Sequence, residues 1–309
     1  MASPVSHLSV GNLNVDVYMV VSRLPGVDEA VTAEESYIGP GGAAANYAVA
    51  VSKAGHAAFL LAHTGRLAVG LGLLSSLERS GVDTSLVKVH EDEMPGIVLV
   101  LVSSQGERAM VKLPGANRIL RGDEASGRRF TVVHVASVGS TVAARAFSSV
   151  EASLRSYDPG GSAYREGIDG IKRLRGLVDI LYVNRSEYRA LTGSEPGLAG
   201  ASRLAELAGV RLLVVKLGGD GALAVEPNGR ALRVEALQVK PVDTTGAGDV
   251  FDAYMNAWLA EGRSVEEALR AASVAAGLKV ERRGAQSAPS REEVEERLGG
   301  GEAPRVWRV

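Results

Sequence analysis

The chain has 309 residues, a formal net charge of -2 and no cysteine. With 46% hydrophobic and 23% charged residues it can bury one large core, and its balanced charge gives no reason to expect nucleic acid or a membrane as a partner. The lack of cysteine excludes disulfides, thiol nucleophiles and thiolate metal sites, and no signal peptide or membrane-spanning apolar run is visible. We therefore expect a cytoplasmic protein with a single α/β domain over residues 1–309.

Short apolar runs alternate with amphipathic stretches over the first two thirds of the chain. The runs have the length and the flanking turn residues of buried strands, and the stretches between them have helical spacing. This alternation predicts a mainly parallel central sheet with helices on both faces, whose ligands bind beyond the carboxyl ends of the strands. The predicted strands are 7–12, 57–63, 131–137, 179–184 and 211–219, and the predicted helices are 42–55, 72–81, 140–156 and 186–193.

Two segments, 17–38 and 96–113, have the pattern of β-hairpins and lack the crossover helix that would place them in the parallel sheet. We infer that these two insertions form a small separate sheet that covers a site as a lid. The exposed edges of such a sheet would allow a homodimer to form through the lid. After residue 249 the spacing predicts two helices with a break at 262–264, a third helix at 290–301, and a loose tail.

The stretch VDTTGAGDVF, residues 242–251, places an acid, a small-residue turn and a second acid at the start of a predicted helix. The free amides of Gly246, Ala247 and Gly248 and the helix dipole favour an anion at this point. An acid in the first turn of a helix is commonly a simple capping residue. However, Asp249 beside an anion hole is also the arrangement that phosphoryl transfer needs, with a base for the attacking hydroxyl and amides for the transferred group.

The stretch GPGGAA, residues 39–44, formally matches a dinucleotide-binding motif, whereas the usual phosphate-binding loop is absent. No acid lies between Asn46 and Leu77 to bind a ribose, so a dehydrogenase is disfavoured. The glycines instead leave room above a helix start, where the amide of Asn46 can meet a polar ligand.

The segments GPGGAAANYAVAVSKAG (39–55) and DTTGAGDVFDAYMNAWLAEG (243–262) together resemble the two signatures of the ribokinase, or PfkB, family of carbohydrate and nucleoside kinases. The resemblance spans nearly the whole chain. It implies a Rossmann-like, mainly parallel α/β domain with a β-sheet lid, ATP as phosphoryl donor and Mg²⁺ as cofactor. The acceptor would be a small sugar, a sugar derivative or a nucleoside.

The resemblance also implies roles for individual residues. Asp249 would be the general base, and Glu187 would help to place Mg²⁺ through water, because magnesium keeps several of its waters. The glycines after Lys216 are also explained by a plain hairpin turn. The remaining implied contacts are Asn14, Asp16, Gly41, Gly42 and Asn46 for the substrate; Asn184, Lys216, Gly218, Gly219 and Gly221 for the nucleotide; and Asp243, Thr245 and Ser287 for a monovalent cation such as K⁺.

The acceptor stays open at this level. Ribokinases tend to carry a glutamate after the central strand, where this chain has ASVGS (136–140), so a pentose-specific contact is in doubt. Arg108 and Lys112 share one face of an alternating strand; facing inward they would suit a phosphate or carboxylate on the substrate, and facing outward they would be solvated. The sequence therefore allows a sugar kinase, a nucleoside kinase, a sugar-phosphate kinase of the 6-phosphofructokinase or ribose-1-phosphate type, and a non-catalytic binding protein.

Overall fold

The computed structural model describes residues 5–301 and 303–309, and its centre is a large sheet. The strands follow the order β15-β14-β13-β12-β11-β10-β9-β1-β4-β5, with β6 also paired to β4. From β12 to β5 all neighbours are parallel, and β13, β14 and β15 extend the sheet in antiparallel fashion at one end. The bounds are β1 Ser6–Gly11, β4 Ala57–Gly65, β5 Val82–Asp83, β6 Val87–His90, β9 Arg129–Ala136, β10 Glu151–Asp158, β11 Ile180–Asn184, β12 Leu212–Lys216, β13 Ala222–Val225, β14 Ala231–Val234 and β15 Val306–Arg308.

Helices cover both faces of this sheet, as the alternating pattern predicts. Successive strand residues point to opposite faces, so Tyr182 belongs to one core cluster and its neighbours Leu181 and Val183 to the other. The first cluster lies under α1 (Ala43–Lys53), α3 (Leu73–Arg79), α8 (Ala247–Ala260), α9 (Val265–Val280) and α10 (Arg291–Gly299). The second lies under α4 (Ser140–Ser149), α5 (Ser162–Arg173), α6 (Arg185–Thr192) and α7 (Leu198–Ala208). A further short helix, α2 (Arg66–Gly70), follows β4.

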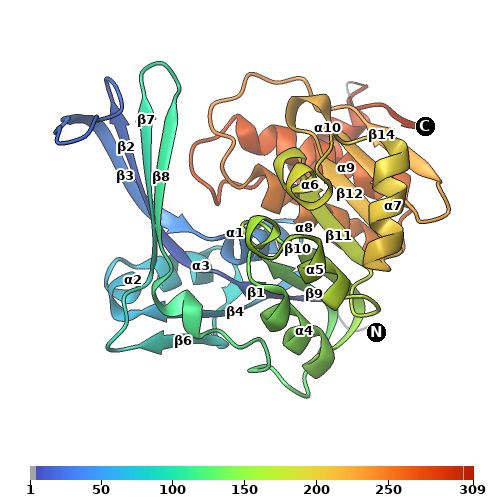
Figure 1. Ribbon diagram of the computed structural model, residues 1–309, viewed down its shortest axis with the longest axis horizontal. Coiled ribbons are helices and arrows are strands. Elements are labelled where there is room, and N and C mark those ends of the chain that lie inside the picture. Colours follow the sequence, from blue (N-terminus) through green and yellow to red (C-terminus); the bar gives the residue numbers. More distant parts are fainter. Residues whose placement is uncertain (1–4, 302) are drawn as a thin grey trace.

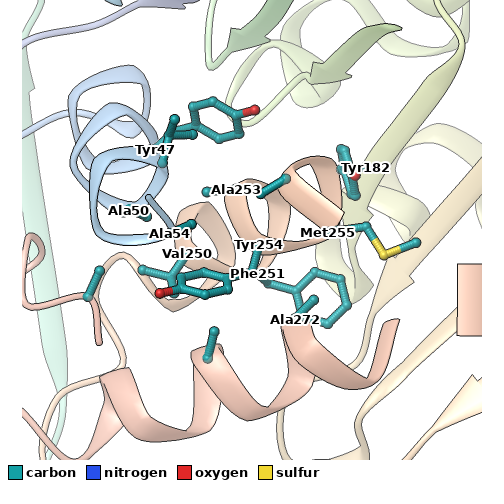
Figure 2. Close-up of a cluster of buried hydrophobic side chains, with 14 of the residues drawn as sticks. Tyr47, Ala50, Ala54, Tyr182, Val250, Phe251, Ala253, Tyr254, Met255 and Ala272 are labelled. Atoms are coloured by element: carbon teal, nitrogen blue, oxygen red, sulfur yellow. The ribbon is translucent and has the colours of Figure 1, made fainter. Parts of the chain in front are cut away.

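The contact between α1 and α8 is the part of the core that matters most for the site. Ala50 and Ala54 beside α8, and Ala253 of α8, are small, and they lie with Val250 and Phe251 in the buried cluster of Figure 2. Small side chains let two helix backbones approach closely, and tight packing then fixes their relative position. The first turns of α1 and α8 are consequently held beside each other.

A second sheet of four strands stands apart from the main domain (Figure 1). Its order is β3-β2-β7-β8, with antiparallel pairs β2–β3 and β7–β8 and a parallel pair β2–β7 at its centre. The two predicted hairpins and their separate sheet are confirmed, and the first hairpin is longer than expected, so that Asn14, Asp16 and Gly41 lie on its strands. The bounds are β2 Asn14–Val21, β3 Ala33–Gly41, β7 Gly96–Ser103 and β8 Arg108–Leu113. We call these four strands the lid.

Three sequence predictions about local structure are wrong. The predicted helix 140–156 ends at Ser149, and residues 151–158 form β10, because pairing with β9 and β11 overrides their helical spacing. The predicted loose tail contains β15, which pairs with β14. The predicted strand 211–219 ends at Lys216 and continues as a short 3₁₀ turn over 218–220.

Candidate active site

A cavity of about 350 Å³ lies between the lid and the main domain. Asn12 and Ser137, which follow β1 and β9, line it together with the first turns of α1 and α8 and residues of three lid strands. This is the place where ligands of parallel α/β sheets bind, beyond the carboxyl ends of the strands. A larger hollow of about 690 Å³ lies beside β13 and β14 and contains none of the predicted site residues.

Asp249 lies in the first turn of α8 and lines the cavity. Nδ2 of Asn46, in α1, donates a hydrogen bond to its Oδ2 at 2.8 Å. Burial raises the pKa of Asp249 to about 7, although the hydrogen bond from Asn46 acts in the opposite direction. A carboxyl group with a pKa near neutrality suits a general base, because it is both ionised and basic at that pH.

The turn before Asp249 requires a glycine at position 246 and leaves little space at position 248. Gly246 precedes α8 with φ +79°, a left-handed conformation, and a Cβ there would overlap the carbonyl oxygen of Ala285. A Cβ on Gly248 would lie 3.3 Å from Nζ of Lys216. Gly246 therefore lines the cavity at the start of the helix, where the dipole favours an anion, and the amide of Ala247 donates a long hydrogen bond of 3.3 Å to the carbonyl of Thr244.

Asp16 contributes a carboxylate to the cavity from β2, opposite the helices. A Cβ on Gly41 would overlap this carboxylate, so this glycine gives the acid its space, whereas a Cβ on Gly42 would overlap the carbonyl of Asn12. Oδ1 of Asp16 is buried and has no hydrogen-bond partner among the described residues, and the same holds for Oδ1 of Asn46. Burial raises the pKa of Asp16 to about 6, with Lys112 acting in the opposite direction.

Asn14 is held in place by a residue that the sequence reasoning missed. Nδ2 of Asn117 donates to Oδ1 of Asn14 at 2.8 Å, and Oδ1 of Asn117 accepts from the backbone of Leu13 at 3.1 Å. Asn117 follows the second lid hairpin, and its only sequence signal is a polar residue after the turn residues Pro114 and Gly115.

Arg108 and Lys112 line the same cavity as Asp249 and Asp16. In the lid, Asp16 pairs with Val98, and Val98 pairs with Lys112, so the two charged side chains lie on one face of the sheet. Two strand spacings separate them by about 10 Å. Of the two orientations that the sequence allowed, the structure has both cations facing the cavity.

Lys216 forms a buried charge cluster behind the first turn of α8. Its Nζ contacts Oδ2 of Asp158 at 2.7 Å and both carboxylate oxygens of Asp252 at 2.8 and 2.9 Å. Burial raises the pKa of Asp252, whereas Lys216 holds the pKa of Asp158 below its usual value in spite of burial. The sequence reasoning missed Asp158 because it missed β10, which ends at this residue.

Asn184 and Glu187 start α6 with a reciprocal capping arrangement. Oε2 of Glu187 accepts from the backbone of Asn184 at 2.8 Å, and Oε1 accepts from Nδ2 of Asn184 at 2.7 Å. Burial and then the charge of Asp158 raise the pKa of Glu187 to about 7. Within residues 5–301 and 303–309, no three His, Cys, Asp or Glu side chains are grouped as metal ligands.

The predicted nucleotide glycines form the turn between β12 and β13. Gly218 and Gly221 have φ +65° and +83°, and a Cβ on Gly221 would overlap the carbonyl of Val234. A Cβ on Gly218 or Gly219 would meet open space. Gly221 is thus required by its positive φ and by the close approach of β14, whereas Gly219 leaves its backbone open.

The predicted cation residues join two loops beside α8. Oδ1 of Asp243 accepts from the backbone of Thr245, and its Oδ2 accepts from the backbone of Gly284, both at 2.9 Å. Oγ of Ser287 donates to the carbonyl of Gly284 at 2.8 Å. Oγ1 of Thr245 accepts a hydrogen bond at 3.0 Å from the hydroxyl of Tyr18, a lid residue with no role in the sequence prediction.

Comparison with known proteins identifies the family. The model for the pfkB family carbohydrate kinases matches residues 6–292. The chain is 33% identical over 293 residues to an ATP-dependent ribose-1-phosphate kinase from Halopiger xanaduensis, covering 93% of this chain and 96% of that one.

Two solved structures extend the comparison. An Arabidopsis thaliana ribokinase complexed with ribose and ATP is 26% identical with a TM-score of 0.83, covering 96% of this chain and 99% of that one. A nucleoside kinase from Methanocaldococcus jannaschii, 21% identical with a TM-score of 0.84 and coverage of 96% and 98%, shares the fold. Among the described residues, no helix combines the length and hydropathy needed to cross a bilayer. The chain belongs to the pfkB family and is a carbohydrate kinase of ribokinase-like fold.

Proposed function

We propose that this kinase transfers the γ-phosphoryl group of ATP to a hydroxyl of a sugar that carries an anionic group, of the ribose 1-phosphate class. The observation that carries the proposal is that Arg108 and Lys112 line the cavity that also contains Asp16 and Asp249. A phosphate on the substrate would be paired by these cations, because charge-assisted hydrogen bonds are the stronger kind. The relative from Halopiger xanaduensis is a ribose-1-phosphate kinase, which supports this substrate class.

The neutral part of the sugar would bind between the lid and α1. The unpaired Oδ1 atoms of Asp16 and Asn46 are buried acceptors, and buried acceptors without partners are costly. Hydroxyl groups of a sugar would donate to both. Asn14, fixed by Asn117, lies two residues from Asp16 on the same face of β2.

Asp249 is the proposed general base. Its carboxylate, at the open end of α8, would remove the proton of the attacking hydroxyl, while the amides of Gly246, Ala247 and Gly248 stabilise charge on the transferred phosphoryl group. Closure of the lid would exclude water and so prevent wasteful hydrolysis of ATP.

The nucleotide would lie on the other side of the first turn of α8, over Asn184 and the turn with Gly218, Gly219 and Gly221. ATP is bound in the Arabidopsis ribokinase complex and is the donor of the Halopiger kinase, which supports ATP as the donor here. Lys216 is already paired with Asp158 and Asp252, so we propose that it does not contact the nucleotide directly and that its positive charge acts through the first turn of α8.

The residues of this chain fit a Mg²⁺ ion that binds together with ATP and is contacted by Glu187 through a water molecule. Both oxygens of Glu187 already accept from Asn184, and a carboxylate oxygen can accept a further hydrogen bond from a metal-bound water. When bound, the ion neutralises charge on the phosphates.

A nucleoside kinase is the second candidate. Val98, Val100 and Met110 form an apolar part of the cavity wall on the lid, and a flat base could pack against it.

The lid also supports a proposed homodimer, since its edge strands β3 and β8 have free backbone groups. Sedimentation velocity would test this, and a monomer at all concentrations would contradict it.

An acceptor screen tests the proposed substrate class. ADP release would be followed with ribose, ribose 1-phosphate, fructose 6-phosphate, ketodeoxygluconate, adenosine and cytidine. We expect the highest kcat/KM with ribose 1-phosphate, and Arg108→Ala or Lys112→Ala to raise its KM about tenfold or more without affecting ribose. Arg23→Ala, which removes an exposed cation of the loop between β2 and β3, outside the cavity, is the matched control. A preference for neutral acceptors, with both lid variants unaltered, would refute the anionic substrate.

A further inference from the structure

Lys279 is a completely buried lysine near the end of α9. Its Nζ donates to the backbone carbonyl of Asp243 at 2.8 Å and to that of Arg282 at 3.4 Å. No carboxylate of the described residues lies within ion-pair distance of it. An ammonium group solvated by backbone carbonyls inside the protein is unusual, because burying a charge is costly unless it has partners.

The carbonyls around Lys279 belong to the two loops that hold the first turn of α8. Val242 and Asp243 donate from their backbone to the carbonyl of Val280 at 2.7 and 3.0 Å, and the carboxylate of Asp243 joins Thr245 to Gly284. The loop after Arg282 also packs against Gly246, because a Cβ at this position would overlap the carbonyl oxygen of Ala285. The ammonium of Lys279 therefore holds the two loops that position the anion hole and Asp249.

A free monovalent cation does not fit at the place that the sequence predicted for it. Such an ion needs several oxygen ligands in place of its water, and the ammonium of Lys279 already takes the carbonyl of Asp243. Both carboxylate oxygens of Asp243 accept from backbone amides, and Ser287 directs its hydroxyl proton to Gly284. A second positive charge beside Lys279 would also be repelled.

We propose that the ammonium of Lys279 is a built-in monovalent cation, which ties the two loops together and adds to Lys216 a second positive charge near the anion hole. The kinase would then work without K⁺, and Lys279 would be a positioning residue. Burial lowers the pKa of Lys279, and the carboxylates of Asp243 and Asp249 counteract this, which places Asp249 within its electrostatic reach. The inference rests on the roles proposed for Asp249 and the amides of 246–248.

Two substitutions at this position separate a cation from a simple packing role. Lys279→Ala removes the charge and leaves space for an ion among the carbonyls, whereas Lys279→Met removes the charge and fills the space. Lys53→Ala is the matched control, because Lys53 is an exposed lysine in the last turn of α1. Turnover and thermal midpoint would be measured in tetramethylammonium, sodium and potassium chloride at constant ionic strength.

We expect the wild type and Lys53→Ala to have the same kcat and thermal midpoint in all three salts. Lys279→Ala should lose about tenfold to a hundredfold in kcat without potassium, and regain activity and thermal midpoint in potassium. Lys279→Met should lose activity and not regain it. The proposal is overturned if potassium activates the wild type, or if Lys279→Ala equals the wild type in tetramethylammonium.

Two further outcomes are also decisive. If neither variant folds, the salt dependence of the wild type still tests the proposal. If no acceptor is turned over, the proposed function fails, and the recovery of the thermal midpoint of Lys279→Ala in potassium tests the cation role separately; no recovery would overturn it.

Discussion

Replacing Asp249 by asparagine should inactivate the protein and stabilise it at the same time. The carboxyl group has a pKa of about 7 in the folded chain against a usual value of 3.8. Since the pKa is higher in the folded state, Asp249 does not destabilise the fold below about pH 4, where it is protonated in both states. As the pH rises to about 7, the unfolded chain ionises more readily, and the destabilisation of the folded state grows. The substituted asparagine would carry no charge to bury, and its amide oxygen could still accept from Asn46.

The size of the effect follows from the same pKa. A rise of the pKa from 3.8 to about 7, at 1.36 kcal/mol per pH unit, corresponds to a destabilisation of about 4 kcal/mol. Water in the open cavity screens the charge, so we take about 2 kcal/mol as the lower bound. For 309 residues the entropy of unfolding is about 0.65 kcal/mol/K, so the thermal midpoint should rise by about 3 to 6 °C near pH 8. The gain should vanish near pH 4, and kcat should fall by about 10² to 10⁴.

Thermal unfolding across this pH range, together with ADP release from the preferred acceptor, measures both effects. Asp169→Asn is the control, because it removes an exposed carboxylate of α5, outside the proposed site, whose ion pair with Lys172 is worth about 1 kcal/mol or less. The reasoning would be refuted by an Asp249→Asn protein that is no more stable than the wild type near pH 8, or that keeps near-native turnover.

Three further predictions concern the surroundings of Asp249. In the wild type, kcat/KM should fall about tenfold per pH unit below about pH 7, because the base must be ionised; a profile that is flat down to pH 5 would contradict this. Gly246→Ala should destabilise the fold by more than Gly72→Ala, since both glycines have similar positive φ (+79° and +74°) but only the Cβ at 246 meets backbone, and chemical denaturation would compare them. Lys216→Met should cost about 3 to 5 kcal/mol by leaving Asp158 and Asp252 without their cation, and Asp252→Asn in the same chain should recover part of that loss in the same assay.

Local patterns carried much of the architecture. The apolar runs at β1, β4, β9 and β11 and the two hairpins were predictable because strand periodicity and turn residues act over a few positions. The strand β10 was not, because its residues 151–158 have helical spacing and become a strand only between β9 and β11. With β10 missed, Asp158 and its contact with Lys216 were missed as well.

Short stretches of sequence were enough to indicate the family, the lid, and the turn at 246–248 with Asp249. Backbone requirements and helix starts depend on only a few neighbouring residues. The packing of the folded chain was needed to show which face of the lid bears Arg108 and Lys112, which acids surround Lys216, and that Lys279 occupies the carbonyls behind α8. These relations join residues far apart in the chain, and their geometry depends on the positions of whole elements. Side-chain charge is visible in a sequence, but its partners are set by the fold.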